Sequence, residues 1–284
     1  MNDAKRLLEV DNLRVTFDTE TGPVHAVRGV SFSLGRERLG IVGESGSGKT
    51  MAGRALLRLI RPPGRISANR MVFDGQDLLA ASERDMRALR GNRIGMVMQD
   101  PKYSLNPVMT VSEQLTEGLR LRDRIGRAEA RAKAISALEA VQIRDPERVM
   151  EAYPHELSGG MGQRVMIAMM LIPEPDLLIA DEPTSALDVT VQAEVLSILD
   201  ALVRDRGMGL IFISHDLRLV ARFCDRVLVM YKGKVVEEIE AANLLAAKHP
   251  YTRGLLNCLP RIGGARGPLP GLDRSGDWAK DGAA

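Results

Sequence analysis

The sequence predicts an α/β protein built around a parallel sheet that is buried on both faces. Three continuous apolar runs, at 177–180, 210–213 and 227–230, alternate with stretches of helical character. Strands covered by helices on both faces have this composition, because neither face of the sheet meets water. A glycine-rich segment at 43–50 lies between a fourth apolar run and another helical stretch, which adds a strand–loop–helix unit.

Short β-rich segments dominate the N-terminal part of the chain. Leu7–Val10 and Leu13–Phe17 read as two strands, and residues 30–34 alternate with the period of two that a half-buried strand shows. Residues 71–75 and 93–98 read as two more strands. We therefore expect a β region around the glycine-rich segment, which itself leads into a helix.

Between about residues 101 and 154 the sequence changes to charged, helical stretches, at 111–122 and 126–143. Four apolar residues of the second stretch recur every three or four positions: Ala130, Ala134, Leu138 and Val141. This spacing places them on one face of a helix. A solvated pair of helices is one interpretation. Because β-like segments resume at Leu177, we favour a helical subdomain inserted into the α/β core.

Composition argues against several classes of protein. The 284 residues include 39 Lys and Arg against 37 Asp and Glu, a net charge of +2, and 4% are aromatic, so nucleic acid is not the expected partner. Cys224 and Cys258 are far apart and form no zinc motif, which fits a reduced, cytosolic setting. The first ten residues hold no apolar signal segment. No apolar run approaches the ~20 residues that span a bilayer.

The glycine-rich segment matches the pattern G-x-x-x-x-G-K-[ST] at every fixed position: Gly43, Glu44, Ser45, Gly46, Ser47, Gly48, Lys49 and Thr50. Between a strand and a helix, this pattern predicts a phosphate-binding loop. Its glycines let consecutive N–H groups point at an anion, and the following helix adds a positive dipole end. We expect Lys49 to reach the β- and γ-phosphates of a nucleotide, and the Thr50 hydroxyl to hold Mg²⁺. A glycine-rich turn before an ordinary helix is the alternative.

The apolar run at 177–180 ends in two carboxylates, Asp181 and Glu182, followed by Pro183. Ligands bind at the carboxyl ends of strands in open α/β sheets. Because neighbouring strand side chains point to opposite faces, the chain must bend here for both carboxylates to act on one ligand, and Pro183 favours such a break. We expect Asp181 to hold Mg²⁺ and Glu182 to activate the water that attacks the γ-phosphate.

A second glycine-rich helix start follows Leu157. Ser158 suits a helix N-cap, and Gly159 and Gly160 allow the backbone to approach an anion closely. This gives a second helix N-terminus suited to phosphate in a chain with one obvious nucleotide. We therefore expect the segment from Ser158 to Met161 to serve the nucleotide of another subunit. A glycine-rich cap on a core helix is the alternative.

In their order along the chain, these motifs resemble the nucleotide-binding subunit of an ATP-binding-cassette (ABC) transporter, from about Leu7 to Glu238. The resemblance implies a P-loop NTPase (RecA-like) core with an N-terminal antiparallel β-subdomain and the helical insert. Leu157 to Met161 resemble the family signature, Leu-Ser-Gly-Gly-Gln. Other family roles fall on Gln99 (a γ-phosphate sensor and Mg²⁺ ligand), His215 (the switch histidine), Asp188 (in the loop that crosses the dimer) and Phe17 (stacked on adenine).

The finer resemblance is to the peptide/nickel (oligopeptide/dipeptide) importer branch. Residues 99–107 resemble the glutamine loop of that branch, Met161 in place of the signature glutamine is typical of it, and His249–Thr252 resemble its C-terminal extension. The resemblance divides the chain into an ABC nucleotide-binding domain at 1–240 and a C-terminal extension at 241–284 whose end is expected to be disordered.

The implied function is ATP binding and hydrolysis, with Mg²⁺, to energise uptake of a peptide, nickel, glutathione or a related small solute. The implied partners are a second ATP-binding subunit, identical or paralogous, two transmembrane permease subunits and, indirectly, a periplasmic or extracellular solute-binding protein. The subunit would lie peripherally on the cytoplasmic face of the inner (plasma) membrane. A non-transport ABC ATPase of DNA repair or translation is the alternative, although such proteins typically carry long coiled coils or two cassettes. A P-loop kinase or helicase-type motor is a third class, which does not need the segment Leu157–Arg164.

Overall fold

The computed structural model describes residues 6–98, 105–122, 124–185, 187–259 and 278. The chain divides into two compact units, the first made of Met1–Ala81 and Ile211–Ala284, the second of Ser82–Leu210. Each is described here by itself. Gln99 and most of the end of the C-terminal extension lie outside the described residues.

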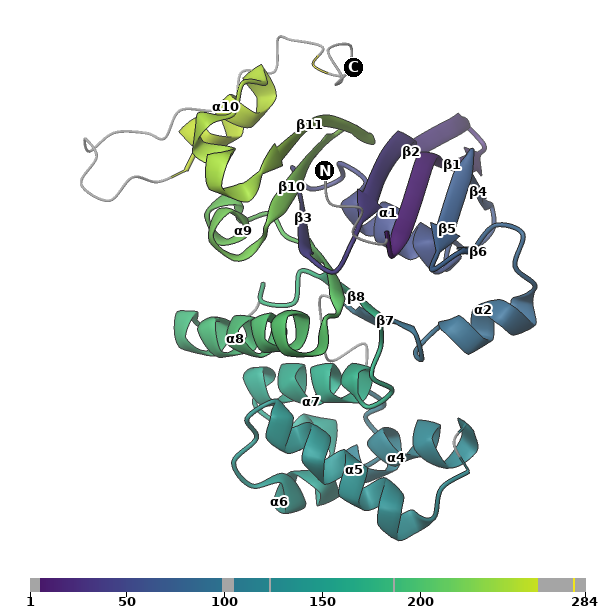
Figure 1. The fold of residues 1–284 in the computed structure, drawn as a ribbon, viewed down its shortest axis with the longest axis vertical. Coiled ribbons are helices and arrows are strands. Elements are labelled where there is room, and N and C mark those ends of the chain that lie inside the picture. The colour runs from purple at the N-terminus through teal and green to yellow at the C-terminus, as the bar shows by residue number, and fades with distance from the viewer. Residues whose placement is uncertain (1–5, 99–104, 123, 186, 260–277, 279–284) are drawn as a thin grey trace. The chain divides into compact units, whose positions relative to one another are not determined.

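The first unit contains an antiparallel sheet, as predicted for the N-terminal part of the chain. Its strands are β1 (Leu8–Thr19), β2 (Gly22–Leu34), β4 (Gly64–Ser67), β5 (Arg70–Phe73) and β6 (Gln76–Asp77). They lie in the order β2-β1-β5-β6, and β4 also pairs with β1 (Figure 1).

The prediction of two separate strands at Leu7–Val10 and Leu13–Phe17 was wrong, because both belong to the single strand β1. The pairing of β1 with β2 shifts register between Val10 and Leu13, and Asn12 has a left-handed φ of 53°. A bulge of this kind inserts an extra residue without ending the strand. The polar Asp11-Asn12 pair therefore marks a bulge and not a turn.

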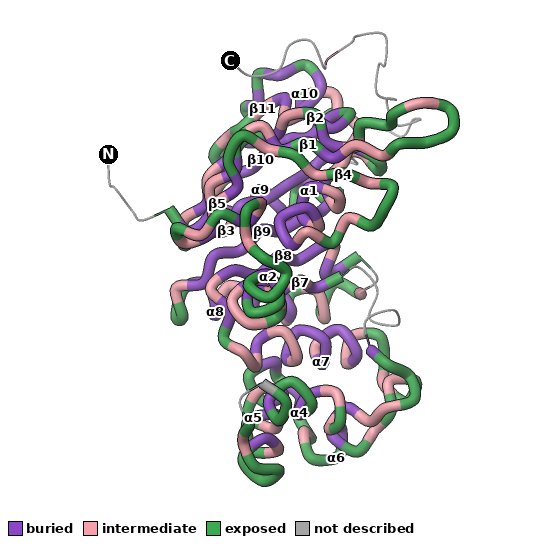
Figure 2. Tube along the Cα trace, turned by 90° about the vertical axis from the view of Figure 1, so that its right-hand side faces the viewer, coloured by how far each residue is buried: buried purple, intermediate pink, exposed green. Residues whose placement is uncertain are grey.

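A second group of strands in the first unit has the order β11-β10-β3-β9, with β3 (Arg38–Val42), β9 (Gly209–Ile213), β10 (Arg226–Tyr231) and β11 (Lys234–Glu240). β10 runs parallel to β3 and antiparallel to β11. The chain passes from the second unit to the first within β9. All five residues of β9 are buried, as the apolar run at 210–213 predicted (Figure 2).

Three α-helices of the first unit are α1 (Lys49–Leu56), α9 (Leu217–Phe223) and α10 (Pro250–Asn257), and a 3₁₀ segment, η2 (Ala241–Ala246), precedes α10. α1 ends at Leu56, after eight residues. Arg58 takes a left-handed φ of 52°, and two prolines follow at 62 and 63, a combination that ends a helix early.

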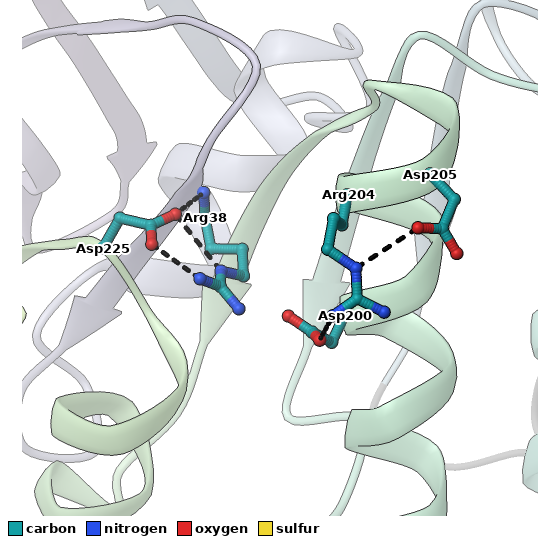
Figure 3. Close-up of polar contacts among 5 residues, drawn as sticks. All are labelled: Arg38, Asp200, Arg204, Asp205 and Asp225. Carbon is teal, nitrogen blue, oxygen red and sulfur yellow. Dashed lines mark hydrogen bonds and ion pairs between the residues drawn. The ribbon is translucent and has the colours of Figure 1, made fainter.

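One ion pair ties the start of β3 to the start of β10. The Asp225 carboxylate accepts hydrogen bonds from the Arg38 backbone N–H at 2.8 Å and from its guanidinium Nη2 at 2.7 Å (Figure 3). Burial raises the pKa of Asp225, but the Arg38 hydrogen bonds and charge lower it by more, so it lies below its usual value. On α8 (Val189–Arg206) of the second unit, by contrast, Arg204 pairs with Asp200 and Asp205 at the surface (Figure 3).

The second unit combines two parallel strands, β7 (Ile94–Val97) and β8 (Leu177–Asp181), with helices. Its helices are α2 (Glu83–Leu89), α4 (Val111–Arg122), α5 (Arg127–Ala140), α6 (Pro146–Glu151), α7 (Gly159–Leu171) and α8 (Val189–Arg206), and a 3₁₀ turn, η1 (Pro154–Glu156), precedes α7.

Helices α4, α5 and α6 lie within the range expected for the helical insert. They pack on one another, and α4 and α5 also pack on α7 (Figure 1). The four residues predicted to share a helix face are all fully buried: Ala130, Ala134, Leu138 and Val141. The interpretation as a solvated helix pair is therefore wrong for this face. None of the described helices combines the length and apolar composition needed to cross a bilayer.

Candidate nucleotide-binding site

The loop at 43–50 leaves β3 and enters α1, as the pattern predicted, and its glycines are required by neighbouring backbone. A Cβ on Gly43 would lie 2.2 Å from the Met230 carbonyl oxygen, and one on Gly48 would lie 2.3 Å from that of Ala26. Gly46 is in open space but has a φ of 79°, which L side chains rarely adopt. The loop is thus pressed against β2 and the end of β10 in a form that excludes side chains.

Two polar side chains of the loop, Ser47 and Lys49, are buried. Lys49 is 6% exposed, and its Nζ donates to the carbonyl oxygens of Gly43 and Glu44, both at 2.9 Å. The Ser47 Oγ is buried and has no hydrogen-bond partner. An unpaired buried hydroxyl beside a buried ammonium fits an anion with oxygen acceptors. The residues present therefore fit the phosphates of a nucleotide.

Helix α1 begins at this loop without a side-chain cap. Its N-cap is Gly48, which is in a left-handed conformation and provides no side-chain cap. The first N–H groups of a helix have no partners within the helix, and the dipole there favours negative charge. Thr50, half-buried in this first turn, carries the hydroxyl expected to hold Mg²⁺.

A residue that sequence reasoning missed reaches the same loop. The Tyr251 hydroxyl, from α10, accepts a hydrogen bond from the Glu44 backbone N–H at 3.2 Å. Beside it, a pocket of about 370 Å³ is lined by Glu44, Ser45, Gly46, Ser47, Tyr231 and Lys232. The segment His249–Thr252 was noted only as a family resemblance, and no spacing pattern predicts a contact over 207 positions.

His215 follows a residue that hydrogen-bonds to β3, the strand that leads into the loop. The preceding residue, Ser214, donates its backbone N–H to the carbonyl oxygen of Ile41 in β3 at 3.1 Å. His215 itself is exposed, and Asp216, not His215, caps α9 by accepting from Arg218 and Leu219 N–H groups. The imidazole is therefore not used as a helix cap, and a role as the switch histidine remains a prediction.

Phe17 lies near the end of β1, opposite Val24 of β2 and Gly64 of β4. A Cβ on Gly64 would lie 2.7 Å from the Phe17 ring, so the ring covers that glycine. The side chain is half-buried and so keeps part of its surface exposed. Stacking on adenine remains a prediction for this ring.

The two predicted catalytic carboxylates occur in the second unit, at the end of β8. Asp181 is the last strand residue and is 4% exposed. Glu182 has a left-handed φ of 48°, and its side chain is half-buried. The predicted bend is therefore present at Glu182. A non-glycine residue in this conformation costs about 1–3 kcal/mol, and such strain clusters at functional sites.

The predicted signature segment starts α7 in the second unit and is exposed at Ser158 and Gly159. The Ser158 Oγ accepts from the Met161 N–H at 3.3 Å, so the predicted N-cap is confirmed. A Cβ on Gly160 would lie 2.7 Å from the Val191 side chain of α8. The α7 start is therefore packed against the first turn of α8.

Asp188 stands at that neighbouring helix start. Its carboxylate caps α8 by accepting from the Thr190 and Val191 N–H groups, both at 3.0 Å. Farther along the same two helices, Arg164 of α7 pairs with Glu194 of α8. Two exposed, capped helix N-termini thus lie side by side, next to a groove lined by Ser158, Gly160, Met161 and Val191 among others.

The predicted site residues fall into two sets. The loop from Gly43 to Thr50, Phe17 and His215 belong to the first unit; the carboxylates Asp181 and Glu182, the segment Ser158, Gly159, Gly160 and Met161, and Asp188 belong to the second. Among the described residues, no three His, Cys, Asp or Glu side chains are grouped to hold a metal. Mg²⁺ at a nucleotide is held mainly by phosphates, water and one or two protein oxygens, for which Thr50 and Asp181 have the right chemistry.

Comparison with known proteins agrees with these features. The family model described as ABC transporter matches residues 27–185. The chain is 49% identical over 275 residues to the glutathione import ATP-binding protein of Pectobacterium atrosepticum, covering 94% of this chain and 44% of that protein. It is 48% identical over 260 residues to the oligopeptide transport ATP-binding protein of Bacillus subtilis, covering 90% and 73%. The chain thus spans less than half of the first relative and about three quarters of the second.

A solved structure supports the same assignment of fold. The dimeric, post-hydrolysis ATP-binding cassette MJ0796, bound to ADP and phosphate, is similar with a TM-score of 0.74 and 26% identity, covering 82% of this chain and 98% of that one. The family model extends from β2 through the loop, the helical region and β8. By family match, sequence identity and fold, the chain belongs to the ABC transporter family.

Proposed function

We propose that this chain is the ATP-binding and ATP-hydrolysing subunit of an importer for peptides or a related small solute. The observation that carries nucleotide binding is the loop, with its buried Lys49 and the unpaired Ser47 hydroxyl. The solute class rests on the names of the relatives, which include oligopeptide, dipeptide and glutathione transport proteins. Nickel and other small solutes remain compatible.

Two ATP-binding subunits are proposed to pair head to tail, with ATP between them. Lys49 and Thr50 of one subunit would hold the phosphates, and Ser158 and Gly160 of the other would face them. The exposure of Ser158 supports this, since it leaves the turn available to a second subunit. Asp188, at the adjacent helix start, would lie at the same interface. The similar cassette MJ0796 has a dimeric structure.

In the proposed reaction, Glu182 orients a water molecule and accepts its proton as the water oxygen bonds to the γ-phosphorus. The bond from the γ-phosphorus to the β–γ bridging oxygen breaks, so that ADP and inorganic phosphate are the products. Lys49 donates to phosphate oxygens and exchanges its loop carbonyl contacts for them. When bound by Thr50 and Asp181, with Gln99 as a further proposed ligand, Mg²⁺ supplies charge that offsets the phosphates. His215 would donate to the γ-phosphate and respond to its loss. Phe17 would stack on the adenine ring.

The coupling partners are proposed to be two transmembrane permease subunits, which would receive the motion through the helical region and the segment after Gln99. A solute-binding protein would deliver the solute on the far side. With these partners, the chain is proposed to lie peripherally at the cytoplasmic face of the membrane. Nucleic acid is not a proposed partner.

Affinity purification from solubilised membranes tests the transport function directly. Recovery of membrane permease subunits with the tagged chain is the expected result. Recovery of ribosomes or DNA-repair proteins, without membrane subunits, would favour the alternative of a non-transport ABC ATPase. A matched purification of the Lys49→Ala variant shows whether the association depends on nucleotide.

A further inference from the structure

Helix α10 contacts the phosphate-binding loop through Tyr251. The Tyr251 hydroxyl accepts a hydrogen bond from the Glu44 N–H at 3.2 Å, and the side chain is fully buried. Glu44 is a variable position of the loop pattern, and Tyr251 hydrogen-bonds with both its backbone and its side chain. Only the backbone hydrogen bond acts on the loop whatever residue stands at position 44.

The backbone carbonyl and the backbone N–H of Glu44 both make hydrogen bonds. Its carbonyl oxygen accepts from the Ser47 N–H at 3.1 Å and from the Lys49 Nζ at 2.9 Å, while its N–H donates to Tyr251. Tyr251 is thus one residue away, through the Glu44 backbone, from the ammonium group expected to bind phosphate. Movement of Glu44 would move a carbonyl that positions Lys49.

The position of Tyr251 is set by contacts that do not involve the loop. The Glu237 carboxylate of β11 accepts from the backbone N–H groups of Lys248 and His249, at 2.8 and 3.2 Å. The His249 Nδ1 accepts from the Tyr251 N–H at 3.2 Å, which caps α10. This network fixes the start of the helix and the backbone of the tyrosine.

Aromatic packing fixes the tyrosine ring as well. Its centroid lies 4.6 Å from that of Tyr231, at the end of β10, and 5.4 Å from that of Trp278. Burial raises the pKa of Tyr251 to about 12, the Glu44 backbone hydrogen bond lowers it, and the Glu44 charge raises it. The phenol is therefore neutral near pH 7 and remains available as an acceptor.

We propose that Tyr251 is a positioning residue of the phosphate-binding loop, by which the C-terminal extension sets the affinity for nucleotide. This rests on the proposed ATP-binding function and adds a residue outside the loop pattern to that site. Without the phenol, the Glu44 N–H loses its partner and the loop populates conformations that do not bind nucleotide. Apparent affinity falls in proportion to the competent fraction.

The Tyr251→Phe variant tests this, because it keeps the ring and removes only the hydroxyl. We expect the Kd for a fluorescent ATP analogue to rise about fivefold, which corresponds to about 1 kcal/mol. The KM for ATP should rise in parallel, with kcat within about twofold, as expected when ground-state and transition-state binding are lost equally. Tyr153→Phe, which removes a hydroxyl from a partly exposed tyrosine of the second unit, is the matched control.

Thermal unfolding without nucleotide separates positioning from general stability. The proposal predicts a small change in midpoint for Tyr251→Phe, with most of the loss appearing in ATP binding. An unchanged Kd would overturn the proposal, and so would a lower kcat at constant KM. It would also be overturned if the loss of stability measured without nucleotide accounted for the whole loss of ATP affinity.

The proposed function is judged separately with the wild-type chain and the Lys49→Ala variant. If the wild-type chain fails to bind the analogue, ATP binding is wrong and the positioning role fails with it. If the wild type binds and Lys49→Ala does not, ATP binding stands, and the Tyr251→Phe result decides the positioning role alone.

Discussion

The chain carries two glycine-rich helix starts that are built in opposite ways. At α1, Gly48 provides no side-chain cap, the preceding loop is pressed against β2 and β10, and Lys49 is buried. At α7, the Ser158 hydroxyl caps the helix, and the segment around it is exposed. The first start is enclosed by its own unit, whereas the second presents an open surface.

This difference fits the proposal that one ATP site is divided between two subunits. The α1 loop would surround the phosphates with groups from one chain, and its geometry needs no partner. The α7 start is already satisfied by its own serine, so further binding there depends on a second molecule that presents phosphate. We therefore expect changes at the loop to affect nucleotide binding itself, and changes at the Ser158 turn to affect dimer formation.

The largest expected effect is on hydrolysis, from Glu182→Gln. Loss of the carboxylate removes the general base, which typically contributes about 10²–10⁴-fold to the rate. ATP binding should persist and the dimer should stay closed, so size-exclusion chromatography with ATP should show a doubled mass. Glu174→Gln is a matched control, because Glu174 is exposed and also has a left-handed φ, of 53°. Hydrolysis at the wild-type rate would show that Glu182 is not the base.

Lys49→Ala should weaken ATP binding about 100-fold, since hydrogen bonds to charged groups contribute about 1.5–3 kcal/mol. Isothermal titration calorimetry measures this on the isolated chain. Lys133→Ala, which removes an exposed lysine of α5 paired with Glu129, should leave affinity unchanged. If the Lys49→Ala variant bound ATP as tightly as the wild type, the claim that the enclosed loop before α1 binds the phosphates would be contradicted.

Two alanine substitutions compare crowding with backbone strain inside the loop. Gly48→Ala combines a clash at 2.3 Å with a φ of 100°, and should lower the free energy of unfolding by about 2 kcal/mol or more. Gly46→Ala meets no atom within 4 Å and should cost about 1 kcal/mol, from its φ alone. Denaturant unfolding measures both. An equal cost at the two positions would mean that crowding by the Ala26 carbonyl is unimportant.

Ser158→Ala tests the other helix start of the comparison, the exposed start of α7 in the second unit. Loss of the cap should lower the free energy of unfolding by about 1 kcal/mol. ATP affinity of the monomer should stay unchanged, while ATP-dependent dimerisation in the Glu182→Gln background should weaken, as light scattering would show. Ser136→Ala on α5 controls for loss of a hydroxyl elsewhere in the unit. A fall in monomer affinity would mean that the Ser158 turn acts on the nucleotide of its own chain.

The smallest expected effect is on the ion pair of Arg38 and Asp225, at the start of the strand that leads into the loop. The Asp225 pKa is lowered in the folded state, so its carboxylate stabilises the fold above the unfolded pKa, and this contribution is lost as pH falls through the folded value. Because the pair is partly exposed, Asp225→Asn should cost about 0.5–1 kcal/mol at pH 7 and less in acid. Asp200→Asn, at the surface pair of α8, should show little change. A pH-independent difference would contradict the role assigned to Arg38.

Much of the fold was predictable because local patterns carry it. The period of Ala130, Ala134, Leu138 and Val141 predicted a buried helix face, and the apolar runs predicted β8, β9 and β10. The bend at Glu182 followed from placing two carboxylates in succession after a strand. The single strand β1 was missed, because the polar residues of a bulge resemble those of a turn.

The candidate site was predictable only where one segment contains the chemistry. The loop and the Ser158 turn are contiguous motifs, so their residue types and spacing predict them. Contacts between distant segments leave no such pattern. The carbonyl oxygens of Ala26 and Met230, which exclude side chains from the loop, and the Tyr251 hydroxyl are examples. Gln99 lies outside the described residues, and its role stays a prediction.

Mixing two defective variants tests most directly the central claim that loop and turn complete one site between subunits. Lys49→Ala disables the loop, and Ser158→Arg blocks the exposed turn. A head-to-tail dimer of the two variants contains one site with both an intact loop and an intact turn. The account predicts that neither variant alone forms an ATP-dependent dimer or hydrolyses ATP, and that the mixture recovers both. Activity of Ser158→Arg alone, or no recovery in the mixture, would contradict it.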